Sequence, residues 1–213
     1  MNVRLIRQQT LSDARKALVL DAARAVFAEA GIEGASIREI ARRAGYTPGA
    51  IYSYFDSKEA MYGELLAESL ERLNVVTDAA LASLPAPRDA SLQLEVVASA
   101  WFGFYADHPR DLDLGFYLAR GLQPRGLTTE LNQQLNSRLY DALKPCEEAM
   151  ICLGLDVQAA RRENTALFAH GVGLLLLQHT GRIRMFGQQA KPLFEDYVRH
   201  LVARLKPVLK PAG

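Results

Sequence analysis

The chain has 213 residues, of which 49 % are hydrophobic and 23 % are charged, and its formal net charge at pH 7 is +1. This length allows one large or two modest domains with a sizeable core, and the near-neutral charge excludes a protein that coats polyanions through bulk basicity. The apolar run Val172–Leu177 is too short to span a membrane, and no amino-terminal run resembles a signal peptide. Cys146 and Cys152 form neither a CxxC pair nor a disulfide framework. The sequence therefore predicts a cytoplasmic protein without a membrane partner.

The first predicted helix begins at Ser12, which can cap it, after a mobile arm over residues 1–11. It runs to about residue 30, and Gly31 ends it. The apolar residues at helical spacing that form its core face are Val19, Ala22, Val26 and Phe27.

Residues 36–58 read as two short helices joined by a tight turn, followed by the start of a third. Ser36 is a good N-cap, and Glu39 completes a capping box. Gly45 supplies the left-handed residue that ends the first short helix, and Thr47 caps the second. The residues that point outward from the second short helix are Pro48, Gly49, Tyr52 and Ser53. Small side chains and a tyrosine suit entry into a DNA major groove, and an ordinary helical hairpin is the alternative.

With this segment, residues 12–70 resemble the amino-terminal domain of the TetR family of bacterial transcriptional regulators. The run IYSYFDSKEAMYGEL, which begins at Ile51, is close to the signature of that family. The other matching positions are Ala22–Phe27, Gly31, Ser36–Ala41, Ala44-Gly45, Gly49–Phe55 and Ser57–Glu59. The resemblance implies an all-α fold. A three-helix helix-turn-helix DNA-binding domain is expected in residues 1–60, and a helical domain for effector binding and dimerisation in residues 61–213.

The resemblance also divides the side chains of the predicted DNA-binding domain by role. Those expected to hold the phosphate backbone are Ser36, Thr47, Tyr54 and Lys58. Those expected to face the groove are Arg38, Pro48, Gly49 and Tyr52, and Arg38 can make a bidentate contact with guanine. Tyr54 stands where many relatives have His. Arg42 and Arg43 are either flanking phosphate ligands or solvated side chains.

The rest of the chain reads as further helices, with no β-strand of note. Ser57 and Asp156 cap two of them, and Pro145 predicts a kink in another. The predicted ranges are 58–81, 92–107, 109–121, 128–153, 156–183 and 192–205.

The middle helices carry an aromatic cluster, which suits either a ligand pocket or plain core packing. In the TetR family this part of the chain typically holds a small-molecule effector, so the predicted partner is an apolar or aromatic molecule. The residues expected to bind it are Trp101, Phe104, Tyr105, Phe116, Tyr117, His170 and Gln178.

The last two helices are expected to form a dimer interface, as the corresponding helices of TetR-like proteins do. Gly171 and Gly173 would allow a neighbouring helix to approach closely, whereas burial within a monomer is the alternative. The residues expected to pair with a second copy are Leu174, Leu177, Tyr197, Val198, Leu201 and Leu205. Because one recognition helix covers few base pairs, the predicted DNA partner is a double-stranded operator with an inverted repeat, bound by a homodimer.

Enzyme signatures are missing from the sequence, which has no GxGxxG, P-loop, GxSxG or HExxH motif and no metal-type Cys/His cluster. We therefore expect no catalytic residues, no metal and no cofactor. The interpretation that the sequence favours is a ligand-responsive, sequence-specific DNA-binding regulator, with repression favoured over activation. The alternatives are a non-specific architectural DNA-binding protein and a cofactor-free all-α enzyme.

Overall fold

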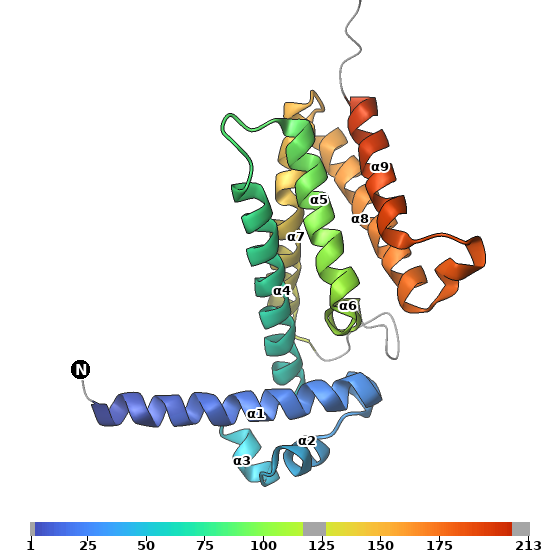
Figure 1. Cartoon of the computed structure of the whole chain (residues 1–213). Coiled ribbons are helices and arrows are strands. Elements are labelled where there is room, and N and C mark those ends of the chain that lie inside the picture. The colour runs from blue at the N-terminus through green and yellow to red at the C-terminus, as the bar shows by residue number, and fades with distance from the viewer. Residues whose placement is uncertain (1–2, 117–126, 206–213) are drawn as a thin grey trace, which may run out of the picture. The chain divides into compact units, whose positions relative to one another are not determined.

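The computed structural model describes residues 3–116 and 127–205, with side chains from residue 6 onward, and every regular element in these ranges is a helix (Figure 1). The predicted all-α fold is thus confirmed. None of the helices in these ranges combines the length and the apolar character that a membrane crossing requires. The elements are α1 (Val3–Gly34), α2 (Ile37–Ala44), α3 (Pro48–Tyr52), α4 (Lys58–Ala82), α5 (Ala90–Asp107), α6 (Pro109–Phe116), α7 (Thr129–Cys152), α8 (Val157–His179), the 3-10 helix η1 (Arg182–Phe186) and α9 (Ala190–Leu205).

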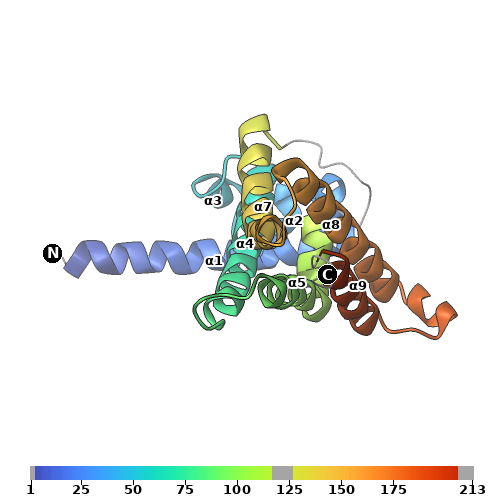
Figure 2. The same cartoon turned by 90° about the horizontal axis from the view of Figure 1, so that it is seen from above.

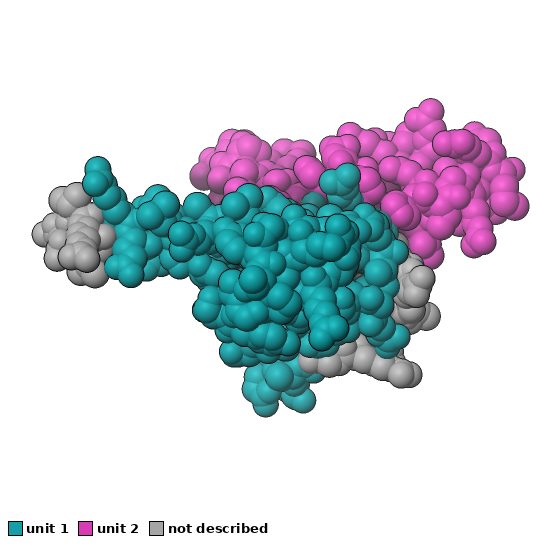
Figure 3. Space-filling view, turned by 90° about the horizontal axis from the view of Figure 1, so that it is seen from below, with its two compact units in different colours: residues 1–69, 110–135 teal, residues 70–109, 136–213 magenta. Residues whose placement is uncertain are grey.

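Packing divides the chain into two compact units, which Figure 3 distinguishes by colour. Unit 1 comprises residues 1–69 and 110–135, and unit 2 comprises residues 70–109 and 136–213. Helix α4 thus contributes its first part to unit 1 and the remainder to unit 2. The functional boundary expected after residue 60 stays a prediction, because compactness alone does not show which residues bind DNA.

Unit 1 is organised around α1, on which α2 packs, while α3 packs on α2 (Figures 1 and 2). Phe27 on α1 and Tyr62 on α4 meet edge to face, with ring centroids 5.6 Å apart. The Tyr62 hydroxyl donates a hydrogen bond to the backbone carbonyl of Leu114 on α6. The apolar side chains that are fully buried in this unit include Val19, Ala23, Ile40, Ile51 and Met61.

Helix α1 begins at Val3, so the predicted start at Ser12 is wrong. Residues 3–12 contain neither glycine nor proline, and they include several good helix formers. The helix therefore continues through Ser12, whose hydroxyl is not needed as a cap. The predicted break at Gly31 is confirmed, because this residue takes φ +67° inside the helical stretch.

The caps of several other helices follow the sequence, whereas some of the limits do not. Ser57 caps α4 and Asp156 caps α8, as predicted, with N–H···O distances of 3.1 and 2.8 Å. Helix α8 ends at His179 and not near residue 183, because Gly181 takes φ +71° there. Helix α7 runs through Pro145 as one helix, and Gln93 Nε2 of α5 donates to the Pro145 carbonyl at 2.8 Å.

Unit 2 has an aromatic core where α5, α8 and α9 pack on one another (Figure 1). The centre of this core is Trp101 of α5, which is fully buried. Its ring centroid lies 5.5 Å from that of Phe168 on α8 and 6.1 Å from that of Phe194 on α9. Phe194 also stacks on Phe102 with centroids 4.3 Å apart. Offset and tilted ring pairs of this kind stabilise a core beyond their buried area.

Candidate nucleic-acid interface

Local hydrogen bonds fix α2 at both ends. The backbone N–H of Glu39 donates to Ser36 Oγ at 3.2 Å, so Ser36 is the N-cap that the sequence predicts. Gly45 takes φ +75° and ends the helix, also as predicted, and its N–H donates to the carbonyl of Ala41. The Glu39 side chain is engaged by arginines, which differs from the reciprocal bond of a capping box. The ends of α2 are thus set by its own sequence.

Helix α3 is short but well anchored. Thr47 is its N-cap, with Oγ1 accepting from the Ala50 N–H at 3.3 Å, and Pro48 occupies the first turn. Ile51 is fully buried, and Phe55 just beyond the helix is also buried. These two apolar side chains hold α3 on the core of unit 1 and thereby determine which of its residues point outward.

The outward face of α3 consists of small side chains and one tyrosine, as predicted. Thr47, Pro48 and Gly49 are exposed, and Tyr52 is 56 % exposed. A Cβ atom built on Gly49 would have no other atom within 4 Å. Packing within the described residues therefore does not require glycine there, and the bare backbone leaves space for a close approach from outside.

Arg38 and Tyr54, two further predicted DNA contacts, differ in their exposure. Arg38 on α2 is exposed, and it has no ion-pair partner in the part of the chain that the structure describes. Its guanidinium donors are therefore available to a ligand. Tyr54 is half-buried, so only part of its side chain can reach a phosphate. The DNA-contact roles assigned to both residues stay predictions.

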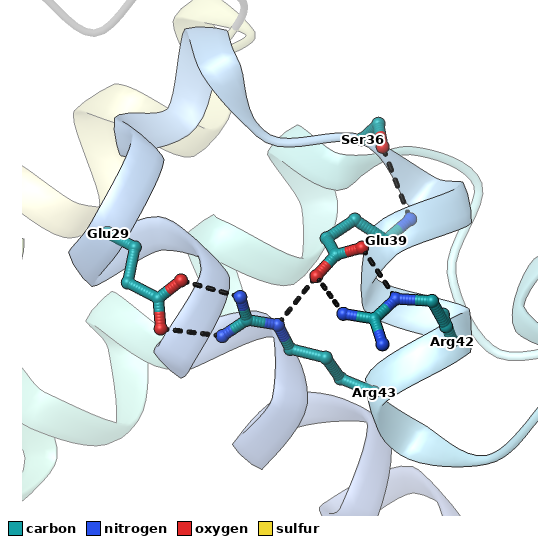
Figure 4. Close-up of polar contacts among 5 residues, drawn as sticks. All are labelled: Glu29, Ser36, Glu39, Arg42 and Arg43. Carbon is teal, nitrogen blue, oxygen red and sulfur yellow. Dashed lines mark hydrogen bonds and ion pairs between the residues drawn. The ribbon is translucent and has the colours of Figure 1, made fainter.

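Two other arginines of α2 are already paired with carboxylates (Figure 4). Arg43 donates from Nη1 to Glu29 of α1 at 2.7 Å and from Nε to Glu39 at 2.8 Å. Arg42 donates from Nε and Nη2 to the same Glu39 carboxylate, at 2.9 and 2.7 Å. Arg43 therefore ties α2 to α1. Arg43 Nη2 donates to the second Glu29 oxygen, so the contact is bidentate and has a defined geometry as well as opposite charges.

The pairing keeps all four groups charged. Hydrogen bonds from Arg42 and from Arg43 lower the pKa of the Glu39 carboxyl to about 2. The Arg43 hydrogen bond also lowers the pKa of Glu29. Hydrogen bonding to Glu29, followed by that to Glu39, raises the pKa of Arg43. At neutral pH the two positive and two negative charges offset one another, so Arg42 and Arg43 add little net positive charge beside α3.

Sequence reasoning did not find the Glu29–Arg43 pair. These residues are 14 positions apart on different helices, and no local pattern connects them. The contact between Glu39 and Arg43, by contrast, has the i,i+4 spacing that a helix brings together, so it was readable in the sequence.

Lys58, which was expected to hold a phosphate, is held by backbone carbonyls. Its Nζ donates to the carbonyls of Glu33 and Ala35, at 3.1 and 3.0 Å. Two of the three ammonium hydrogens therefore connect the start of α4 with the end of α1, and the third is left for a phosphate. The phosphate role of Lys58 stays a prediction.

The residues predicted to bind an effector are dispersed. Trp101, Phe104 and Tyr105 are buried in unit 2, whereas Phe116 belongs to unit 1 and Tyr117 lies outside the described residues. Gln178 is exposed on α8. The structure thus does not bring the seven predicted residues together in one unit, and their ligand role stays a prediction.

His170 is half-buried on α8. Its ring stacks on that of Tyr197 from α9 with centroids 4.1 Å apart. Burial lowers the pKa of His170, and its Nε2 has no hydrogen-bond partner in the described structure. This ring therefore packs in its neutral form between α8 and α9.

A cavity of about 180 Å³ lies between α7 and α8 in unit 2. None of the residues predicted to bind an effector lines it. The sequence offered no signal for it, since helix periodicity does not show which positions of two helices leave a space between them. The lining residues are Asn136, Leu139, Tyr140, Leu143, Glu147, Arg161, Asn164, Thr165 and Phe168.

The residues predicted for dimerisation fall into two groups. Leu174, Val198 and Leu201 are buried in their own unit, and their role in dimerisation stays a prediction. Helix α9 packs on α5 and on α8 within unit 2. The members that remain partly exposed are Leu177, Tyr197 and Leu205, and their role stays a prediction.

Comparison with known proteins places the helix-turn-helix in a family. Residues 19–65, which include α2 and α3, match the family model described as "Bacterial regulatory proteins, tetR family". The HTH-type transcriptional repressor KstR2 of Rhodococcus jostii is 42 % identical over 59 residues, covering 28 % of this chain and 29 % of KstR2. The uncharacterized HTH-type transcriptional regulator YdgC of Bacillus subtilis is 33 % identical over 108 residues, covering 50 % and 54 %. The chain therefore spans about half or less of the length of these curated relatives.

The fold extends the likeness beyond the helix-turn-helix. The transcriptional regulator FadR from Bacillus subtilis, solved in complex with stearoyl-CoA, superposes with a TM-score of 0.66. The superposition covers 88 % of this chain and 97 % of FadR at 24 % identity, a level that supports the same fold and nothing finer. Together, the family model and the regulatory relatives show that residues 19–65 belong to the tetR family of bacterial regulatory proteins, and the superposition shows a shared fold over most of the chain.

Proposed function

We propose that the chain is a sequence-specific DNA-binding transcriptional regulator that acts as a homodimer and responds to a small molecule. The single observation that carries the DNA-binding part is the outward face of α3. This face is small, exposed and fixed in orientation by Thr47, Ile51 and Phe55. A short helix of this kind can place its first residues against base edges in the major groove.

Base preference comes from Arg38, since its free guanidinium fork matches the O6 and N7 acceptors of guanine. Tyr52 and the bare backbone at Gly49 add apolar contact and a close approach. The helix N-termini at Ser36 and Thr47 supply backbone donors for phosphates, and Lys58 supplies its remaining ammonium hydrogen. The paired Arg42 and Arg43 position α2 and do not hold phosphates.

The homodimer forms through α8 and α9. Helix α8 leaves Ala166, Ala169 and Gly173 exposed along one side, followed by Leu176, which is 39 % exposed. Small side chains at this spacing allow a second helix to approach closely, and Leu177 and Tyr197 extend the apolar surface. Two copies related by a two-fold axis then present two α3 helices to an inverted repeat.

Repression is the favoured mode, because KstR2 of Rhodococcus jostii is described as a repressor. A small molecule weakens DNA binding only through different affinities for the DNA-bound and free conformations. A tenfold effect requires about 1.4 kcal/mol, which a single repacked aromatic contact can supply.

The test is the selection of bound duplexes from a random DNA library by the full chain at about 150 mM salt, near physiological screening. We expect an inverted repeat whose half-sites lie about one DNA turn apart. Recovery of unrelated sequences with equal affinity would instead favour an architectural protein. Retention of no duplex would remove the DNA-binding proposal.

A matched pair of variants tests the site. Arg38→Ala should weaken binding to the selected operator and relax the preference at one base pair of each half-site, by about 1–3 kcal/mol. Arg162→Ala removes an equally charged, exposed residue from α8 in unit 2 and should leave the preference unchanged. An equal loss on every sequence in Arg38→Ala would show that Arg38 contacts phosphate and not bases.

A further inference from the structure

The first four turns of α1 carry no fully buried side chain among those that the structure describes. The side chains of residues 6–18 are exposed except for those of Ser12 and Lys16, which are half-buried, and Val19 is the first that is fully buried. Figures 1 and 2 show this segment running past α3, away from the other elements of unit 1. At 1.5 Å per residue, residues 3–18 span about 24 Å. We call these residues the α1 extension.

Packing within unit 1 holds the base of the α1 extension. Lys16 Nζ lies 2.5 Å from Glu64 Oε1 of α4 and 5.4 Å from the centroid of the Phe55 ring. Because Phe55 closely follows α3, the α1 extension leaves unit 1 beside the helix that is proposed to enter the major groove. A helix of this length without tertiary packing is marginal in water. A partner that covers the α1 extension would supply the missing contacts.

The α1 extension is rich in positive charge. Its sequence contains Arg4, Arg7, Arg15 and Lys16, against a single acidic residue, Asp13. Lys16 is already paired with a carboxylate. Arg7 and Arg15 are exposed, and neither has an ion-pair partner within residues 3–116 and 127–205. Two guanidinium groups are therefore available to an anion outside the chain.

Arg7 and Arg15 share one face of the helix with two exposed leucines. Residues 7, 11, 15 and 18 are three or four positions apart, a spacing that places side chains in one row along a helix. Leu11 and Leu18 are 60 % and 55 % exposed. Asp13 lies about 200° around the helix from Leu11, on the opposite side. The four side chains of this row, which we call the arginine face, thus combine positive charge with apolar surface.

DNA fits the arginine face better than an anionic membrane does. Amphipathic helices that bind membranes bury a broad apolar face, which typically includes Trp or Phe. The sequence of residues 3–18 has no aromatic residue, and the polar run Gln8–Thr10 interrupts its apolar positions. The α1 extension also begins beside α3, so it continues the proposed DNA interface within the same unit.

We propose that the arginine face binds the phosphate backbone of the DNA that flanks the half-site contacted by α3. Arg7 and Arg15 hold phosphate oxygens, while Leu11 and Leu18 lie against deoxyribose carbons. The phosphates of one strand are about 3.4 Å apart along the duplex axis, so the α1 extension passes about seven of them. This proposal rests on the DNA binding proposed above. It adds affinity that depends on the presence of flanking DNA and not on its sequence.

Two duplexes that carry the selected operator test the proposal. One ends at the outer base pairs of the inverted repeat, and the other adds about one DNA turn on each side. Fluorescence anisotropy measures the affinity of the full chain for each duplex over a range of salt concentrations. We expect tighter binding of the longer duplex and a salt slope steeper by about 4 for the bound dimer, because each of four phosphate contacts contributes about 0.9.

A matched pair of double variants locates the contact. Arg7→Gln combined with Arg15→Gln removes both charges but keeps good helix formers. This variant should bind the two duplexes equally and keep the base preference of the unmodified chain. Arg182→Gln combined with Arg184→Gln removes the same charge from exposed residues of η1 in unit 2, and it should keep the advantage of the longer duplex.

The outcomes separate this proposal from the function on which it rests. Equal binding of both duplexes by the unmodified chain would overturn the proposal and leave the proposed function standing. The same holds if the arginine-face variant keeps the advantage of the longer duplex, or if the η1 variant loses it. Binding of neither duplex would refute both. Vesicles that contain phosphatidylserine test the other polyanion: if only the unmodified chain binds them, and it binds the two duplexes equally, the arginine face serves a membrane.

Discussion

Gly171 is the position at which one added methyl group should disturb the protein most clearly. A Cβ atom there would lie 2.5 Å from Trp101 Cζ3 and 3.0 Å from Phe194 Cε2, and both rings are fully buried. Overpacking a core costs about 1–3 kcal/mol, and the rigid rings place this site near the upper value. Alanine is about 1 kcal/mol more favourable than glycine inside a helix, which offsets part of this cost. Gly171→Ala should therefore destabilise the protein by about 2 kcal/mol.

Gly103→Ala on α5 is the matched control, because a Cβ atom there would have no other atom within 4 Å. It should stabilise the protein by up to about 1 kcal/mol. Thermal unfolding of both variants at one protein concentration measures the difference, and Gly171→Ala should melt about 4–8 °C below the unmodified chain. A Gly171→Ala variant as stable as Gly103→Ala would refute the close packing of α8 on Trp101.

The other predictions concern pH, Lys58 and dimerisation. The pKa of Glu39 falls from 4.5 to about 2 on folding, so its stabilising contribution is complete above pH 4.5 and disappears towards pH 2. Melting temperatures measured between pH 4.5 and about 2 should show this loss of stability in the unmodified chain. The Glu39→Gln variant should lack the contribution of Glu39 to the loss. Lys58→Met should lower the melting temperature and weaken DNA binding evenly across sequences, with a salt slope smaller by about 1, unlike the exposed Lys191→Met. In sedimentation, Leu176→Arg should shift the protein towards monomer, and the similarly exposed Val76→Arg should not. An intact dimer in Leu176→Arg would place the interface elsewhere.

The helix-turn-helix was predictable from the sequence because its signals act over a few residues. Ser36, Thr47 and Ser57 each accept a backbone N–H three positions on, and Gly45 ends α2 by itself. The same reasoning misplaced the start of α1. A possible N-cap such as Ser12 marks the start of a helix only where the residues before it disfavour the helical conformation. Here those residues favour it.

Features that depend on contacts between helices were not predictable in the same way. Glu29 meets Arg43 only because α2 packs on α1. The cavity beside Asn164 exists because α7 and α8 leave a gap. The apolar stripe on α9 was visible, but periodicity does not distinguish a side chain that packs on its own core, such as Val198, from one that faces a partner.

The ion pairs of Arg42 and Arg43 with Glu29 and Glu39 affect how such a regulator would search a genome. Non-specific affinity arises mainly from cations that displace counterions from the DNA backbone. A surface on which Arg42 and Arg43 are paired with Glu29 and Glu39 displaces few counterions. Its residence at each of the roughly 10⁶–10⁹ competing sites is therefore brief. Under the proposed function, more of the protein would then stay unbound and able to sample its operator, and discrimination would rest on Arg38 and the small face of α3.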